Sequence, residues 1–410
     1  MNIKHYIKSH FSEAKIRQLH IFFAVVLSSS VMMIFNIFSA KALSVDDFGR
    51  FNLFIVWLTI GSVIARLGSD QLIVYKFSLD GTRNLMFFLL LSFLLSIILS
   101  FFICSFVLID VDVLLAVMGI FGLAAVELFF STFKSLSKAV VYYYTRMIIL
   151  AGGLIMLLIV FFSKGSYLDI NFFFYVYVFL FLLINLALFA MLRFKQTRFN
   201  IPKELNIQYR SYSIFNALAG VLINRLDLIL VGFFLTPGDA GKYGVVLIFL
   251  FVLNTVIGVQ ATYWGPIFSR FHNSSDFIML KKSYFVSKTY SWITILIAAF
   301  FCYLLIEPSI IFLGSGYEDI ASLILIRCGF QALALMLGIP GVFLSMTGNP
   351  QNQFERLVFG VIVTGVLGLI LVPYYGLIGA AIAGGAGSIS SAIIGELYAR
   401  KLLHNQGIKI

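Results

Sequence analysis

The chain is a succession of apolar stretches of about twenty residues each, the length that a helix needs to cross the hydrocarbon core of a bilayer. Only 11% of the residues are charged and 61% are hydrophobic, whereas a soluble domain carries about 25% charged residues. A transmembrane barrel would instead show runs of about ten residues with alternating polarity. We therefore expect an all-α polytopic membrane protein.

Twelve segments have the length and composition of a membrane-crossing helix. No connection between them exceeds about twenty residues, so no soluble catalytic domain is expected, and no Gly-x-x-x-x-Gly-Lys-Ser/Thr phosphate loop is present. The longest connection, residues 193–211, divides the chain nearly in half, which predicts two six-helix bundles, 1–205 and 206–410. The predicted spans are residues 20–42, 51–77, 84–109, 112–133, 141–163, 171–192, 212–234, 242–268, 290–312, 320–345, 356–373 and 377–399.

Lysine and arginine are distributed unequally between the two sides that twelve spans define. One side holds both tails, the central connection and most of the 29 basic residues. Because basic connections remain in the cytoplasm, both termini are expected there. The asymmetry also accounts for the net charge of +11 without a nucleic-acid partner. The opposite side holds mainly acids: Asp46, Asp47, Asp110, Asp112, Asp169, Asp239, Glu307, Glu318 and Asp319.

A nine-residue turn at the end of the first span recurs at the same place in the second half. Residues 43–51 read Leu-Ser-Val-Asp-Asp-Phe-Gly-Arg-Phe, and residues 235–243 read Leu-Thr-Pro-Gly-Asp-Ala-Gly-Lys-Tyr. In both copies an acidic turn precedes a glycine, a basic residue and an aromatic residue. Since each half holds an even number of spans, the halves run in the same direction. A pseudo-twofold axis along the membrane normal is expected to relate them.

This turn and two further segments resemble the polysaccharide-exporter branch of the MOP superfamily, and within it the Wzx-type O-antigen flippases. The segments are Ile-Asn-Arg-Leu-Asp-Leu-Ile-Leu-Val-Gly at 223–232 and Val-Pro-Tyr-Tyr-Gly-Leu-Ile-Gly-Ala-Ala at 372–381. The resemblance implies an inner-membrane flippase of bacterial O-antigen or surface-polysaccharide synthesis. Such a protein moves undecaprenyl-diphosphate-linked oligosaccharide units from the cytoplasmic to the periplasmic leaflet by alternating access. It also implies the polysaccharide polymerase and chain-length machinery as candidate partners.

Two other functions remain open. A MATE-like cation-coupled drug exporter belongs to the same superfamily, but its cavity for cationic drugs should be acidic or aromatic, whereas the charges inside these spans are net basic. A membrane polysaccharide polymerase or ligase would be an enzyme with a large periplasmic loop. Every connection on that side is short, so we expect no enzyme.

Four arginines lie within the predicted spans: Arg66, Arg146, Arg225 and Arg327. A charge at mid-membrane costs about 2.5–3.5 kcal/mol, so each should face protein or water. Guanidinium binds phosphate through paired donors and stays charged when buried. We predict that Arg66, Arg225 and Arg327 hold the diphosphate, with Arg146 a further candidate. As alternatives, Asp70 could neutralise Arg66, Arg225 could form an inter-helix ion pair, and Arg146 could reach toward the membrane surface.

Polar residues of the first and seventh spans, Asn36 and Asn224, are predicted to contact sugar hydroxyls. Asp227 and Glu127 lack an obvious partner on their own helices, so either could take up H⁺ or Na⁺ and couple transport to an ion gradient. No cofactor is expected. The three cysteines fall in apolar stretches without a Cys-x-x-Cys pair, and this spacing does not predict a metal site.

Overall fold

A computed structural model describes residues 3–76, 85–106, 112–136, 138–164, 168–192 and 207–405. Every regular element in these ranges is an α-helix, as expected. The first half contains α1 (Ile3–Ala42), α2 (Val45–Arg66), α3 (Ser69–Lys76), α4 (Leu85–Phe106), α5 (Val113–Ser135), α6 (Ala139–Lys164) and α7 (Ile170–Met191). The second half contains α8 (Ile207–Phe234), α9 (Pro237–Asn273), α10 (Phe277–Leu313), α11 (Ile320–Met336), α12 (Pro340–Met346) and α13 (Pro350–Asn405).

Ten of the described helices are long and apolar enough to cross a membrane, and α11 with α12 forms an eleventh, bent span. The two arms of α13 meet at Gly376, whose backbone is not helical. Glycine adopts this positive φ without steric strain. Because α13 has 56 residues, more than twice the length of one crossing, its two arms make two passes. The described helices therefore agree with the twelve spans expected.

One predicted span is broken, and several helices, among them α1, α9 and α10, are longer than predicted. The span at 51–77 is interrupted at Leu67 and Gly68, which both have positive φ, so α2 ends and the short α3 begins there. Helices α9 and α10 have 37 residues each and meet at a polar turn where Asp276 caps α10. The apolar pattern predicts only the part of a helix that lies in lipid, and these helices extend beyond it. The predicted span 320–345 bends by 44° between α11 and α12.

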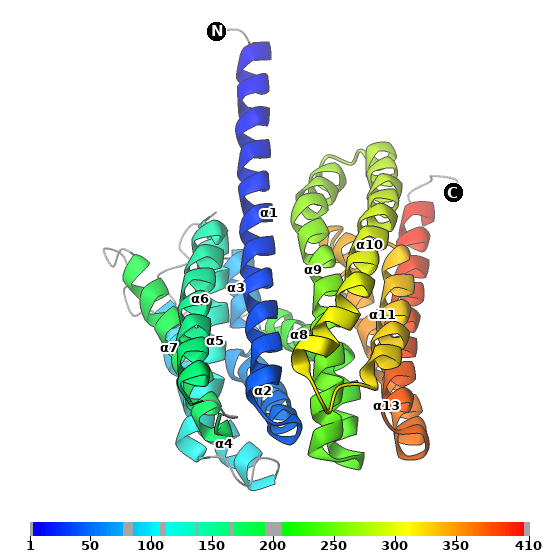
Figure 1. The fold of residues 1–410 in the computed structure, drawn as a ribbon. Coiled ribbons are helices and arrows are strands. Elements are labelled where there is room, and N and C mark those ends of the chain that lie inside the picture. Colours follow the sequence, from blue (N-terminus) through cyan, green and yellow to red (C-terminus); the bar gives the residue numbers. More distant parts are fainter. Residues whose placement is uncertain are drawn as a thin grey trace.

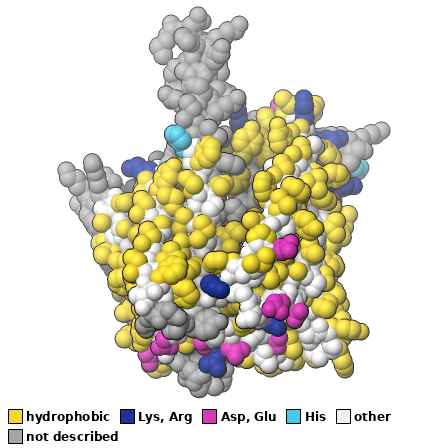
Figure 2. All heavy atoms as spheres, viewed as in Figure 1, with side chains coloured by type: hydrophobic (Ala, Val, Ile, Leu, Met, Phe, Trp, Pro, Cys, Tyr) yellow, Lys and Arg dark blue, Asp and Glu magenta, His cyan; other side chains and the backbone are white. Residues whose placement is uncertain are grey.

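The helices form two bundles whose chain ends lie at the same end of the molecule (Figure 1). We call this end, where α5 and α13 finish, the terminal end, and the other, where α2 and α9 begin, the distal end. Hydrophobic side chains cover the middle of the face in Figure 2, and acidic side chains gather toward its distal end. The predicted boundary between residues 205 and 206 lies outside the described residues.

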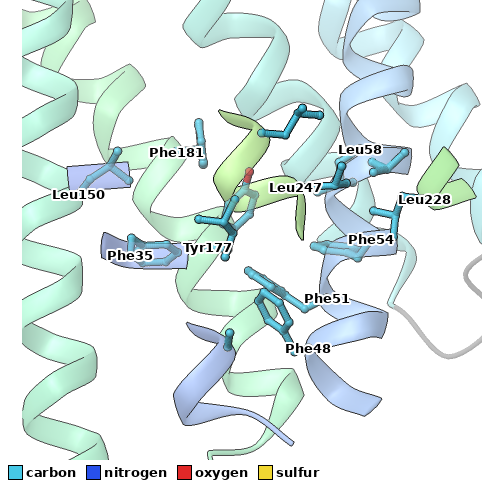
Figure 3. Close-up of a cluster of buried hydrophobic side chains, with 14 of the residues drawn as sticks. Phe35, Phe48, Phe51, Phe54, Leu58, Leu150, Tyr177, Phe181, Leu228 and Leu247 are labelled. Atoms are coloured by element: carbon cyan, nitrogen blue, oxygen red, sulfur yellow. The ribbon is translucent and has the colours of Figure 1, made fainter. Parts of the chain in front are cut away.

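A continuous apolar core joins the two bundles. Figure 3 shows Phe54 and Leu58 of α2 beside Leu228 of α8 and Leu247 of α9, all of them buried. On the other flank of α2, Phe51 packs edge-on against Tyr177 of α7, with ring centroids 5.5 Å apart. Helix α2 therefore contributes side chains to both halves, and it holds the first bundle against the second.

The repeated turns begin α2 and α9 with the same chemistry. Ser44 caps α2 by accepting a hydrogen bond from the Asp47 backbone N–H at 3.2 Å, and Thr236 caps α9 by accepting one from Asp239. The Asp239 carboxylate accepts in turn from the Thr236 backbone N–H, which completes a capping box. In α9 the acidic residue of the repeat therefore takes part in capping the helix.

The same turns bring α2 and α9 into backbone contact at the distal end. A Cβ atom added to Gly49 would lie 1.8 Å from the Pro237 carbonyl oxygen, and one added to Gly241 would lie 2.0 Å from the Val45 oxygen. Val45 and Pro237 hold equivalent positions in the two copies of the repeat. The contact of Gly49 with Pro237 is therefore equivalent to the contact of Gly241 with Val45. A twofold axis between the two glycines produces such a reciprocal contact. The repeated glycines therefore close the molecule at the distal end.

Candidate functional site

A cavity of about 400 Å³, the arginine cavity, lies where the two halves meet. Residues of both halves line it, and those that carry chemistry are Asn36, Asn52, Arg66, Glu127, Tyr142, Arg146 and Arg225. The structure therefore brings together three of the four intramembrane arginines with Asn36 and Glu127. Three cations and a single carboxylate in the lining make this cavity positively charged.

Arg66 is the arginine of this cavity whose charge is balanced. Its Nη1 atom lies 3.4 Å from the Asp70 carboxylate and 3.6 Å from that of Glu127. Its Nε atom donates to the Ser62 carbonyl oxygen at 3.2 Å. The pair with Asp70, the alternative raised by their spacing, is therefore present. Asp70 is buried, but the Glu127 side chain is 43% exposed and faces the cavity.

Arg146 and Arg225 carry the uncompensated charge of the cavity. Within the described ranges neither forms an ion pair, although both line the cavity. The Nε atom of Arg146 is buried without a hydrogen-bond partner. Since a buried cation and an unmet donor are both costly, their natural complement is an anionic ligand rich in acceptors.

A second cavity of about 950 Å³, the amide cavity, lies beside the first and reaches the terminal end. Its polar lining includes Lys134, Asn224, Asn254, Thr262, Gln331, Ser345, Gln353, Arg356, Ser388 and Ser391, and no carboxylate is among the described residues that line it. Asn254 donates to the Asn224 side-chain oxygen at 3.3 Å and accepts from Gln331 at 2.8 Å. Linked amides and hydroxyls of this kind offer both donors and acceptors, which sugar hydroxyls require.

Two helices, α6 and α8, contribute neighbouring residues to the walls of both cavities. On α8, Asn224 lines the amide cavity and Arg225 lines the arginine cavity. On α6, Tyr143 and Tyr142 divide in the same way. Consecutive helical residues point about 100° apart, so each of these helices presents one residue to each cavity. The two cavities therefore adjoin along α6 and α8.

Arg327 and Asp227 line neither of these two cavities and instead bind each other. The Arg327 Nε atom lies 3.0 Å from the Asp227 carboxylate, which also accepts from the Tyr243 hydroxyl at 2.8 Å. Both charged side chains are buried, and Gly384 of α13 leaves room for them, since a Cβ there would lie 2.3 Å from Asp227. The pair is a structural link among α8, α9 and α11. The Arg327 Nη1 atom donates to the Gln331 side-chain oxygen at 3.4 Å, and Gln331 lines the amide cavity.

We predict that Asp227→Ala lowers the apparent unfolding temperature of the purified protein strongly, because it leaves Arg327 buried without its counter-ion. Breaking a buried ion pair from one side costs about 3–5 kcal/mol. The double variant Asp227→Leu with Arg327→Met should regain much of the loss. Thermal unfolding in detergent measures all three against Asp319→Ala, an exposed carboxylate. A single variant as stable as the Asp319→Ala control would contradict the structural role.

Sequence reasoning did not select several residues that line the cavities. Lys134 and Arg356 lie at the ends of predicted spans on the basic side, and Asn52 and Asn254 are single polar residues in apolar helices. A polar residue in a span that lacks a partner one turn away is the signal that could have found Asn52 and Asn254. Nothing in the sequence shows that Arg356 lies in a cavity wall.

The helical architecture is similar to that of solved transporters of the MOP superfamily. An inward-facing multidrug-resistance MATE transporter of the MOP superfamily aligns with 96% of this chain and 98% of its own, with a TM-score of 0.67 and 14% sequence identity. An outward-facing structure of a transporter of this family aligns with 95% of this chain and 96% of its own, with a TM-score of 0.62 and 12% identity. The chain therefore has the fold of these transporters, as the resemblance to the MOP superfamily implied.

Two curated proteins are similar in sequence over half of the chain, whereas no family model matches it. The uncharacterized membrane protein EpsK of Bacillus subtilis is 24% identical over 218 residues, which cover 51% of this chain and 42% of EpsK. The probable low-salt glycan biosynthesis flippase Agl15 of Haloferax volcanii is 24% identical over 224 residues, covering 52% and 45% of the two chains. The matches thus span less than half the length of these relatives.

Proposed function

We propose that the protein is a flippase for lipid-linked oligosaccharides, and that it moves an undecaprenyl-diphosphate-linked repeat unit of O-antigen or another surface polysaccharide. One observation carries this proposal: Arg146 and Arg225 share a cavity between the two halves without a paired carboxylate of their own. The adjoining amide cavity supplies groups that bind sugars. The name of Agl15, a glycan biosynthesis flippase, supports the same substrate class.

In this proposal the diphosphate binds in the arginine cavity and the sugars bind in the amide cavity. Arg146 and Arg225 contact the phosphate oxygens, and Asn36 contributes an amide to the same site. Arg66 attracts the diphosphate less strongly, because Asp70 and Glu127 already balance its charge. Asn224 and Asn254 bind sugar hydroxyls. Arg327 supports the site through its pair with Asp227 and does not contact the ligand.

The charge of the cavities distinguishes this function from the drug exporter of the same fold. Cationic drugs require acidic or aromatic walls. The linings contain aromatic side chains such as Tyr142 and Tyr177, but among the described residues they hold one carboxylate, Glu127, against five cations. An enzyme of glycan polymerisation fits less well, because both cavities lie within the helical bundles. We propose a cytoplasmic location for the terminal end, so that the amide cavity receives its ligand from the cytoplasmic leaflet. The polymerase and chain-length proteins would act on the delivered product.

We further propose Glu127 as the residue that couples transport to H⁺ or Na⁺. It faces the arginine cavity and is 43% exposed, whereas Asp227 is already neutralised by Arg327. In proteoliposomes, Glu127→Gln should transport at a rate that no longer responds to an imposed proton or sodium gradient. Asp112→Asn, an exposed acid outside both cavities, serves as the matched control. A Glu127→Gln protein that keeps the full gradient response would exclude this role.

A deletion and complementation experiment tests the proposed function in the native host. The surface polysaccharide is measured together with the membrane leaflet that holds the lipid-linked repeat unit. We expect deletion to remove the polymer and to retain repeat units on the cytoplasmic leaflet, and we expect the gene to reverse both effects. Repeat units that reach the periplasmic leaflet in the deletion strain but remain unpolymerised would instead indicate an enzyme or an accessory protein.

A further inference from the structure

The amide cavity holds two cations from opposite halves of the molecule. Lys134 lies in the last turn of α5, and Arg356 lies in the second turn of α13. Both line the cavity, and no acidic residue lines it with them. A cavity for a neutral glycan needs amides and hydroxyls, which are present, but it needs no cation. The two basic residues are therefore unexplained by sugar binding alone.

Neutral groups fix the Arg356 guanidinium at the cavity wall. Its Nε atom donates to the Gln353 side-chain oxygen at 2.6 Å, and its Nη1 atom donates to the Ser391 hydroxyl at 3.1 Å. Gly341 lies flat against the guanidinium, because a Cβ added there would be 2.1 Å from Nη2. The side chain is thus held in one orientation before any ligand binds, which reduces the entropy lost on binding.

Arg356, like Arg225, differs from three cations of the second half that pair with carboxylates. Lys288 and Arg400 both bind the Glu396 carboxylate at 2.8 Å, and Arg327 binds Asp227. In the part of the chain that the structure describes, Arg356 pairs with no carboxylate. A guanidinium that is oriented, partly buried and unpaired in a cavity wall is suited to an anionic ligand group.

We propose that Arg356, with Lys134, forms a second anion subsite and that the transported glycan is acidic, with a sugar carboxylate that binds there. This inference rests on the proposed function, in which the diphosphate occupies the arginine cavity. The two cavities adjoin along α6 and α8, so one ligand can place its diphosphate at Arg225 and a sugar carboxylate at Arg356. The subsite selects acidic over neutral repeat units.

Binding of three soluble probes to the full chain in phosphatidylcholine nanodiscs tests the subsite. The probes are a disaccharide that contains glucuronic acid, its neutral glucose counterpart, and inorganic pyrophosphate. We expect the acidic disaccharide to bind at least about tenfold more tightly than the neutral one, the gain from one charge-assisted hydrogen bond. Arg356→Gln should remove this preference and leave pyrophosphate binding unchanged. Arg225→Ala should weaken pyrophosphate binding and keep the preference.

Two variants make the comparison specific. Arg356→Lys keeps the positive charge and should keep part of the preference for the acidic disaccharide. This variant therefore distinguishes an effect of the lost charge from an effect of misfolding. Lys401→Gln removes an exposed cation at the terminal end of α13 and should change nothing. Equal binding of the two disaccharides, or a preference that survives the Arg356→Gln and Lys134→Gln exchanges, would overturn the proposal. So would a preference that disappears when anionic phosphatidylglycerol is added, because a lipid headgroup would then occupy the subsite.

The outcomes also separate this inference from the proposed function. Pyrophosphate binding that depends on Arg225, together with equal binding of the two disaccharides, would contradict the acidic subsite and leave the flippase proposal standing. Pyrophosphate binding that depends on Arg356 would instead assign this residue to the diphosphate and overturn the second subsite.

Discussion

Replacing Arg225 by alanine is expected to reduce transport of the lipid-linked oligosaccharide by at least about a hundredfold, since paired charge-assisted hydrogen bonds to phosphate are lost. Arg225 lines the arginine cavity and forms no ion pair with a described residue, so its charge is available to the ligand. The measurement is the rate at which repeat units appear on the far leaflet of proteoliposomes.

Three further variants complete this test: a conservative substitution, a second cavity arginine and a control outside the cavity. Arg225→Lys keeps the charge but loses the planar pair of donors, so an intermediate rate is expected. Arg146→Ala should resemble Arg225→Ala, because both line the same cavity. Arg50→Ala removes an exposed arginine of the repeated turn and should transport normally. Full transport by both Arg225→Ala and Arg146→Ala would show that the cavity does not hold the diphosphate.

Replacing Gly49 by alanine is expected to open the distal end and to reduce transport by more than about tenfold. The added Cβ would lie 1.8 Å from the Pro237 oxygen and 2.7 Å from the Gly241 nitrogen, so α2 and α9 would have to separate. Both neighbours are backbone atoms, which cannot rotate aside as a side chain can. A protein that cannot close at this end loses one of the two states that alternating access requires.

Cysteine labelling measures the opening directly. Asn52→Cys, placed in a chain without its native cysteines, lines the arginine cavity and reports access from the distal side to a membrane-impermeant maleimide. Gly49→Ala should raise this labelling, and Gly241→Ala should act in the same way. Gly152→Ala is the matched control, because a Cβ there meets nothing within 4 Å. Labelling and transport of Gly49→Ala equal to those of Gly152→Ala would mean that the glycine contact does not control access.

Much of the fold can be predicted from the sequence, because a helix that crosses a membrane needs about twenty apolar residues. Apolar stretches of span length predict the helices, and the interval between the predicted spans 356–373 and 377–399 contains Gly376, where the two arms of α13 meet. The break after Arg66 is missed because Leu67, an apolar residue, adopts the left-handed conformation. The full lengths of α9 and α10 are missed because their ends extend beyond the apolar stretches. Hydropathy does not predict the helical structure of these polar ends.

The site is predicted less completely, because cavity walls depend on how helices pack. Arg225 and Asp227 are two residues apart, which places them about 200° apart around the helix, and accordingly one lines a cavity and the other is buried. The sequence could not pair Asp227 with Arg327, which lies 100 residues further along the chain. In the first half, 192 residues earlier, Phe35 occupies the position equivalent to Asp227. The ion pair is thus a feature of the second half alone, and the repeat does not predict it.

The most direct measurement is flipping by the purified protein in proteoliposomes loaded with an undecaprenyl-diphosphate-linked oligosaccharide. A periodate or lectin probe that cannot cross the bilayer counts the units exposed on the outer leaflet over time. We predict exposure that depends on this protein, that falls to the level of empty liposomes in Arg225→Ala, and that persists in Arg50→Ala. Equal exposure with and without the protein, or an unchanged rate in Arg225→Ala, would contradict the proposal that the arginine cavity carries the diphosphate across the membrane.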